Sequence, residues 1–281
     1  MIPINYAVAF FGLLLASIFD IKTREVPDWL NYSLIAFGFG SAIITSILYS
    51  TPIYILYSAI GFVFGMLVSF LFYYTGQWGG GDSKMLMGLG AILGFNISGG
   101  IPFIVVLLMN IFIVGALYSM GWSVFLAYKH KKEFKKTFSE LVHSKKVMTY
   151  RKIITTITIL GLVYFFFAPI MLKPVIIGLL VIIFFGFYFI IYSKAVEKSS
   201  MEKIILVSKL TEGDWVLERV TIKGEIHRFS REGISKKEID MLKKSFKKKT
   251  IRIKEGIPFL PSFFLAYIIT FLMGNWVILM V

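Results

Sequence analysis

Long apolar runs and short polar connections alternate along this chain of 281 residues. Runs of about 17–25 residues without a charge recur, and at a rise of about 1.5 Å per residue such a run crosses a hydrocarbon layer of about 30 Å. A backbone in lipid has to satisfy its own hydrogen bonds, so these runs are predicted to be helices. The pattern predicts about eight transmembrane helices, at residues 3–19, 29–48, 53–74, 83–97, 101–127, 153–172, 174–193 and 257–281.

Composition agrees with this all-α polytopic membrane fold. The hydrophobic fraction is 57% and the mean hydropathy is +0.78, whereas soluble domains are about 45–50% apolar. The fourth predicted span is the shortest: from Asp82 to Phe95 a helix would measure only about 21 Å. Asp82 is therefore expected below the membrane surface, or in a locally thinned bilayer.

The positive charge of the chain gives an orientation. Net charge is +14, and cytoplasmic loops of membrane proteins carry an excess of Lys and Arg. If the N-terminus lies outside, the loops 20–28, 75–84, 128–152 and 194–256 are cytoplasmic and hold 29 of the 30 Lys and Arg residues, Lys173 being the exception. Both termini are then predicted to lie outside the cell membrane. This distribution explains the charge without a nucleic-acid partner.

The region 194–256 differs from the rest, because short β-type runs replace the apolar helices. Strands are predicted around Ile204–Val207, Trp215–Leu217 and Thr250–Lys254, with a β-hairpin that turns at Lys223–Gly224. Ser235 and Glu238 form a capping box, which predicts a helix to about Phe246. The expected division is a transmembrane block at 1–127, a basic cytoplasmic loop at 128–152, a transmembrane hairpin at 153–193, a small cytoplasmic α+β module at 194–256 and a last helix at 257–281.

Two aspartates are the candidates for chemistry. Asp20 ends the first predicted span and Asp82 follows three glycines, so both are expected at the cytoplasmic ends of helices. Ionisable groups at membrane depth are costly and tend to be functional. Two neighbouring carboxylates share one proton, so that one can act as base and the other as acid. Taken singly, each has a structural alternative, because Asp82 suits a helix N-terminus and Asp20 an ordinary charge beside the membrane.

The residues around Asp20 and Asp82 help to decide between a structural and a chemical role. Pro27 and Asp28 follow Asp20, and Gly79-Gly80-Gly81-Asp82-Ser83-Lys84 leads into a glycine-rich apolar run. This arrangement resembles the Gly-x-Gly-Asp membrane aspartyl proteases, and most closely their type IV prepilin and archaeal preflagellin peptidases. The resemblance implies that Asp20 and Asp82 are the catalytic pair and that Pro27, Asp28, Gly79, Gly81 and Lys84 are motif residues. The two glycines would let a substrate backbone approach Asp82 and would tolerate a positive φ.

The same resemblance implies a function. Family members cut short basic leader peptides from flagellin-like or pilin-like precursors, at the junction with a hydrophobic helix. The expected enzyme is thus an aspartic endopeptidase at the cytoplasmic face, with precursor proteins and membrane lipid as its partners. No cofactor is expected, and a metal site is not expected either, because the chain has no cysteine and its three histidines lie apart in polar loops.

Two other classes of function stay open at this stage. Intramembrane carboxylates and glycine-broken short helices also occur in transporters and ion pathways, although both aspartates here are expected at one face rather than at the midplane. A membrane scaffold whose 194–256 module binds a partner is the third class. It predicts that replacing either aspartate leaves function intact.

Overall fold

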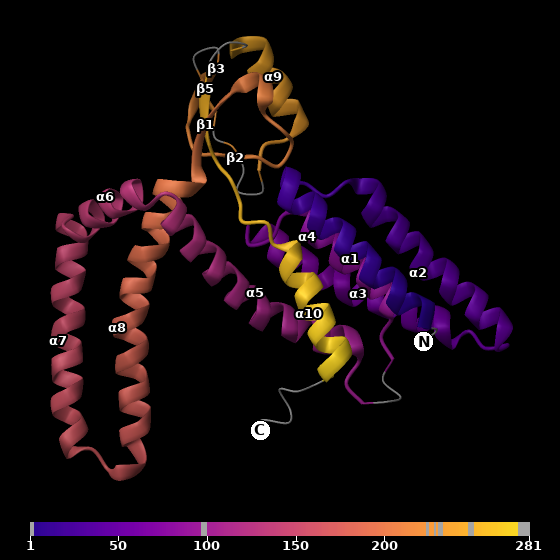
Figure 1. The fold of residues 1–281 in the computed structure, drawn as a ribbon, viewed down its shortest axis with the longest axis horizontal. Coiled ribbons are helices and arrows are strands. Elements are labelled where there is room, and N and C mark those ends of the chain that lie inside the picture. The colour runs from indigo at the N-terminus through magenta and orange to yellow at the C-terminus, as the bar shows by residue number, and fades with distance from the viewer. Residues whose placement is uncertain are drawn as a thin grey trace. The chain divides into compact units, whose positions relative to one another are not determined.

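The chain is mostly helical in the computed structural model, which describes residues 3–96, 100–222, 225–227, 229, 233–246 and 250–274. Helices α1 to α8 follow one another along the chain with short connections, and strands lie between α8 and α10 (Figure 1). In order they are α1 Pro3–Thr23, α2 Asp28–Leu48, α3 Ile53–Tyr74, α4 Gly80–Leu93, α5 Phe103–Lys129, α6 Lys131–Val142, α7 Lys145–Phe167, α8 Lys173–Val196, α9 Lys236–Phe246 and α10 Leu260–Met273.

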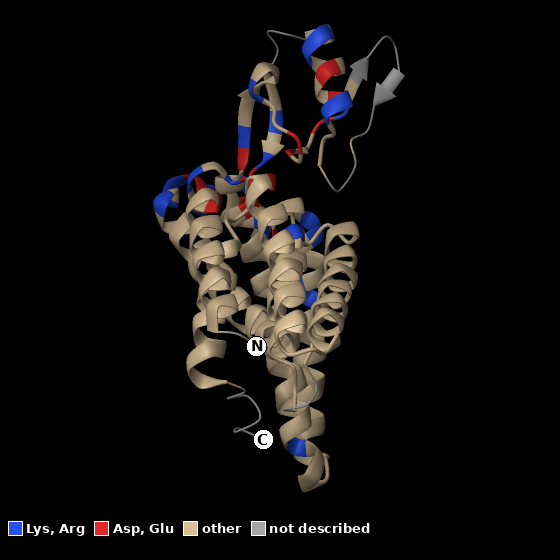
Figure 2. Cartoon of the chain, turned by 90° about the vertical axis from the view of Figure 1, so that its right-hand side faces the viewer, with Lys and Arg blue, Asp and Glu red and all other residues tan. Residues whose placement is uncertain are grey.

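Six helical stretches in the described part of the chain are long and apolar enough to cross a membrane. They are α1, α2, α3, α5, α7 and the stretch Ile170–Met201, which contains α8, and long parts of these helices carry no charged residue (Figure 2). The chain is therefore a multi-pass membrane protein. The fourth and last predicted spans correspond to α4 and α10, each of 14 residues. Residues 97–99 and 275–281 of these regions lie outside the described residues, and the count of eight spans stays a prediction.

The chain divides into two compact units, residues 1–121 with 205–281 and residues 122–204. In the first unit α4 packs against α1, α2 and α3. Glycines make this packing unusually close: a Cβ atom at Gly61 of α3 would lie 2.2 Å from the carbonyl oxygen of Gly90 in α4. Small residues let helix backbones approach in this way in membrane proteins. The short helix α4 is thereby fixed inside the bundle.

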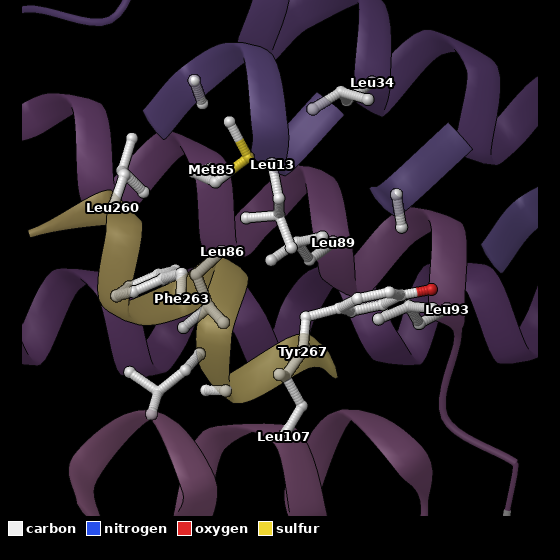
Figure 3. Close-up of a cluster of buried hydrophobic side chains, with 14 of the residues drawn as sticks. Leu13, Leu34, Met85, Leu86, Leu89, Leu93, Leu107, Leu260, Phe263 and Tyr267 are labelled. Carbon is white, nitrogen blue, oxygen red and sulfur yellow. The ribbon is translucent and has the colours of Figure 1, made fainter. Parts of the chain in front are cut away.

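Helix α10 completes the core of the first unit. Leu260, Phe263 and Tyr267 of α10 are almost fully buried and point toward the side chains of α4 and α5, including Leu86 and Leu107 (Figure 3). The Tyr267 hydroxyl donates a hydrogen bond to the carbonyl of Tyr6, 2.8 Å away. The C-terminal helix is thus held against the N-terminal one, and its first turn lies where α1 ends.

The strands near the C-terminus agree with the sequence prediction. A sheet in the order β1-β5-β2 contains Glu202–Leu206, Thr250–Lys254 and Trp215–Val216, and β2 pairs antiparallel with β5. Strands β3, Val220–Ile222, and β4, Glu225–His227, form a separate antiparallel pair, whose predicted turn at 223–224 lies outside the described residues. Ser235 and Glu238 exchange the expected capping contacts at the start of α9. Ile239 and Leu242 of α9 pack with Ile251 and Ile253 of β5 in a small core.

The second unit is built from the end of α5 and from α6, α7 and α8. Helices α7 and α8 form an antiparallel pair joined by a short 3₁₀ turn at Ile170–Leu172. Helix α7 begins at Lys145, eight residues before the predicted span at 153, because Ser144 caps it and the basic first two turns remain helical. Helix α6 is a separate element in the loop predicted at 128–152.

Candidate functional site

Asp20 lies in the last turn of α1, where its side chain is buried: the residue is 8% exposed. Its carboxylate oxygen Oδ2 accepts a hydrogen bond from the backbone N–H of Leu260, 2.9 Å away. Leu260 is the first residue of α10, and the N–H groups of a first helical turn have no partner within their own helix. The N-terminus of α10 therefore fixes one oxygen of Asp20.

Asp82 is held in a comparable way at the start of α4. The helix begins at Gly80, so Asp82 is in its first turn, half-buried. Its Oδ2 accepts a hydrogen bond from the backbone N–H of Gly79, 3.1 Å away. The sequence suggested that Asp82 precedes the helix as its N-cap. The carboxylate instead reaches back to the residue before the helix, and a negative charge at this end is favoured by the helix dipole.

The structure brings these two carboxylates together. Asp20 lies close enough to Asp82 for the two charges to interact. Asp82 comes from α4 and Asp20 from α1, which pack against each other directly. A backbone N–H binds Oδ2 of each group, and the backbone of Phe259 also interacts with the Asp20 carboxylate. Such a pair is able to exchange protons with a third group placed between them.

The motif residues Asp28 and Lys84 form a pair of their own. Lys84 Nζ donates to Asp28 Oδ1, which joins the first turn of α2 to the second turn of α4. The side chain of Asp28 is 59% exposed, in contrast to the buried Asp20. Pro27 directly precedes α2 and has the φ of −58° that proline imposes. Asp28 and Lys84 thus join α2 to α4 close to Asp82, and Pro27 precedes α2.

The two motif glycines differ from the expectation in one respect. Gly79 has φ −76° and Gly81 is in the first turn of α4, so neither adopts the positive φ that the sequence analysis allowed for. Gly81 is tightly packed, because a Cβ there would meet Val26 at 3.3 Å. At Gly79 a Cβ would meet only Asp82 Oδ2, at 3.6 Å. Gly79 therefore leaves the side of the Asp82 carboxylate open.

Three groups near Asp20 were not found by sequence reasoning. The first is the Leu260 amide, 240 residues away along the chain. The second is Arg24, whose φ is +61° and whose charge interacts with Asp20. The third is Tyr118 of α5, which also interacts with Asp20. The only available signal was the position of Arg24 four residues after Asp20, whereas the contacts of Leu260 and Tyr118 depend on the tertiary fold.

The chain was compared with known proteins. Residues 7–120 match the type IV leader peptidase family. Preflagellin peptidase from Methanocaldococcus jannaschii is 38% identical over 90 residues, which cover 32% of this chain and 38% of the relative. The preflagellin peptidases of Methanococcus maripaludis and Methanococcus voltae are 37% and 34% identical over 90 residues, each 32% of this chain and 39% and 38% of the relatives.

The chain spans about two-fifths of the length of the curated relatives that it matches. No solved structure matches it. The matched residues include α1 from residue 7 onward and all of α2, α3 and α4. They therefore include Asp20, Asp82, the Asp28–Lys84 pair and the motif glycines. Residues 7–120 of this chain are therefore similar in sequence to the type IV leader peptidase family.

Proposed function

We propose that this chain is a membrane aspartyl endopeptidase that removes short basic leader peptides from preflagellin-like or prepilin-like precursors at the cytoplasmic membrane face. The observation that carries the proposal is the pair formed by Asp20 and Asp82, each with one carboxylate oxygen held by a backbone N–H at a helix N-terminus. Both lie inside the residues that match the leader peptidase family, and the matched relatives are named preflagellin peptidases.

The reaction that suits this pair is hydrolysis of a peptide bond with one shared proton. The ionised carboxylate takes a proton from water while the water oxygen bonds to the scissile carbonyl carbon, and the protonated carboxyl gives its proton to the carbonyl oxygen. The C–N bond then breaks as the nitrogen receives a proton from the first aspartate. The second aspartate regains its proton from the hydroxyl of the collapsing intermediate, so the pair returns to its starting state.

The substrate class follows from charge and depth. The N-terminal block offers Asp20, Glu25, Asp28 and Asp82 against three basic residues up to position 127, within a chain of net charge +14. A basic leader is attracted by this local excess, although salt weakens the attraction over about 8–10 Å. A precursor with a leader in the cytoplasm and a hydrophobic helix in the bilayer places its scissile bond at the level of helix ends, where both aspartates are.

The test is co-expression with a panel of leader-bearing precursors, read by gel shift and N-terminal sequencing of the product. Asp20→Asn and Asp82→Asn keep the size and most hydrogen-bonding capacity but remove the titrating group, so each should lower cleavage at least about a thousandfold. The double variant should be no worse than either single variant, because the two groups act as a unit. Protein level and membrane insertion should stay normal in all three. Retained cleavage by the Asp82→Asn variant would contradict the proposal that the chain is an aspartyl protease.

A further inference from the structure

Helix α6 is placed at the membrane surface by its neighbours in the chain. It covers Lys131–Val142 and follows α5 after a single residue, His130, while two residues separate its end from the start of α7. Both α5 and α7 are long and apolar enough to span a membrane. A 12-residue helix between two such spans lies on the polar side of the membrane, close to where the chain leaves the hydrocarbon. The basic first two turns of α7 separate its end from the apolar run. Helix α6 therefore lies at the boundary between lipid and water.

The two faces of α6 differ in burial and chemistry. Phe134, Phe138 and Leu141 are half-buried, and the Phe134 ring packs edge-on against Tyr192 of α8 at a centroid distance of 5.5 Å. Four exposed lysines, Lys131, Lys132, Lys135 and Lys136, lie beside this apolar face and extend away from it around the helix. An apolar face against protein and hydrocarbon, with lysines on the rest of the helix, is the arrangement of helices that lie in the membrane interface.

The charge of this segment is not balanced within the second unit. Residues 128–152 contain nine Lys and Arg against the two acidic residues Glu133 and Glu140. None of the four lysines of α6 forms an ion pair with a carboxylate among the described residues. These cations are therefore available to a partner of opposite charge.

We propose that α6 and its flanking basic residues bind the anionic headgroups of membrane lipids. The occupant is identified by three observations: the helix is tethered at the membrane surface at both ends, its apolar face is already against α8, and its lysines are spread around the helix rather than gathered around a point. A single free phosphate would need convergent donors. A charged lipid surface needs only a row of cations, each strengthening binding about fivefold near the surface. The inference does not depend on the peptidase function.

The experiment measures lipid selectivity of the full-length chain. The purified protein in neutral detergent is given equal amounts of phosphatidylglycerol and phosphatidylcholine with the same acyl chains, and bound lipid is counted by native mass spectrometry. The wild-type chain should prefer phosphatidylglycerol by at least about tenfold. The variant K132Q/K135Q/K136Q should lose at least about tenfold of that preference, and raising the salt concentration should weaken the preference of the wild type.

A matched control separates this site from general charge. K237Q/K243Q/K244Q removes the same three charges from α9 in the C-terminal module and should keep the wild-type preference within about twofold. Circular dichroism and gel filtration establish that both variants are folded. An unchanged preference in the α6 variant, or an equal loss in the α9 variant, overturns the proposal. So does full competition by millimolar glycerol phosphate, which would make the site a phosphate site instead of a lipid site.

Discussion

At the scale of single residues, each of the two aspartates is held by a backbone N–H group. Leu260 N–H holds Asp20 and Gly79 N–H holds Asp82. A backbone donor in a rigid helix end keeps a carboxylate oriented without a conformational cost for each turnover. These backbone contacts explain how the two carboxylates are oriented.

Gly79 offers a direct test of access to Asp82. Its φ and ψ suit any residue, and a methyl group there would meet only Asp82 Oδ2, at 3.6 Å. Gly79→Ala should therefore fold normally, yet place a methyl group beside the carboxylate and lower cleavage by roughly 10–100-fold, the order expected from small misplacements of reacting groups. Cleavage kinetics and melting temperature in detergent should be measured together. A fall in both, or in neither, would show that Gly79 does not govern access.

Asp28 is the competitor of Asp20 for the first catalytic role, because it is also expected at the cytoplasmic edge. Its side chain is 59% exposed and is paired with Lys84, and exposed ion pairs contribute only about 0–1 kcal/mol. Asp28→Asn should keep cleavage within about tenfold of the wild type, and Lys84→Met should resemble it. Precursor cleavage in membranes gives the measurement. Loss of activity in Asp28→Asn, with normal activity in Asp20→Asn, would transfer the catalytic role to Asp28.

At the scale of elements, α4 is a short helix whose end is satisfied by other helices. Its last carbonyls accept hydrogen bonds from Asn5 Nδ2 of α1, to Ile92 at 3.0 Å, and from Ser58 Oγ of α3, to Ala91 at 2.7 Å. A helix end away from water needs such partners. With 14 residues, α4 measures about 21 Å, less than a hydrocarbon layer of about 30 Å. The hydrogen bonds from Asn5 and Ser58 satisfy carbonyls at the C-terminal end of α4, so this short helix can stay within the bundle.

The glycine contact between α3 and α4 should decide whether this helix packs. Gly61→Ala places a Cβ atom 2.2 Å from the Gly90 carbonyl oxygen, so the backbones must separate. Overpacking of this kind costs about 1–3 kcal/mol, and we expect a lower melting temperature and lower cleavage. Gly40→Ala in α2 is the matched control, since nothing lies within 4 Å of a Cβ there. Equal melting temperatures for the two variants would contradict the packing argument.

Element types were predictable from sequence, while several boundaries were not. The length of the apolar runs without charged residues indicated the long helices, and the Ser235–Glu238 capping box indicated the start of α9. Helix α4 begins at Gly80 rather than at 83, because close packing against α2 and α3 outweighs the low helix propensity of glycine. Helix α7 extends to Lys145 for a different reason: a capped, basic turn continues the helix beyond the apolar run. Neither the close packing of α4 nor the extension of α7 can be read from the periodicity and hydropathy of the sequence.

At the scale of the whole molecule, the site depends on residues far beyond the family match. Residues 7–120 supply both aspartates, but Leu260, which holds Asp20, belongs to the C-terminal helix α10. Sequence patterns identified the pair because both members end or begin an apolar run. They did not identify the contact with Leu260, because a backbone amide has no sequence signature and the contact joins positions 240 residues apart.

The orientation in the membrane is the last prediction, and it determines on which side the leader must be presented. The chain has no cysteine, so single cysteines can be introduced without background. A cysteine at Ser50, exposed between α2 and α3, should react with an impermeant thiol reagent added outside intact cells, as should one at position 98, which lies outside the described residues. A cysteine at Glu140, exposed on α6, should react only after permeabilisation.

The expected labelling pattern rests on the distribution of Lys and Arg, of which 29 of 30 lie in the loops assigned to the cytoplasm. The reverse labelling pattern would put Asp20 and Asp82 at the outer face, where a cytoplasmic leader cannot reach them, and would refute the proposed substrate together with the topology.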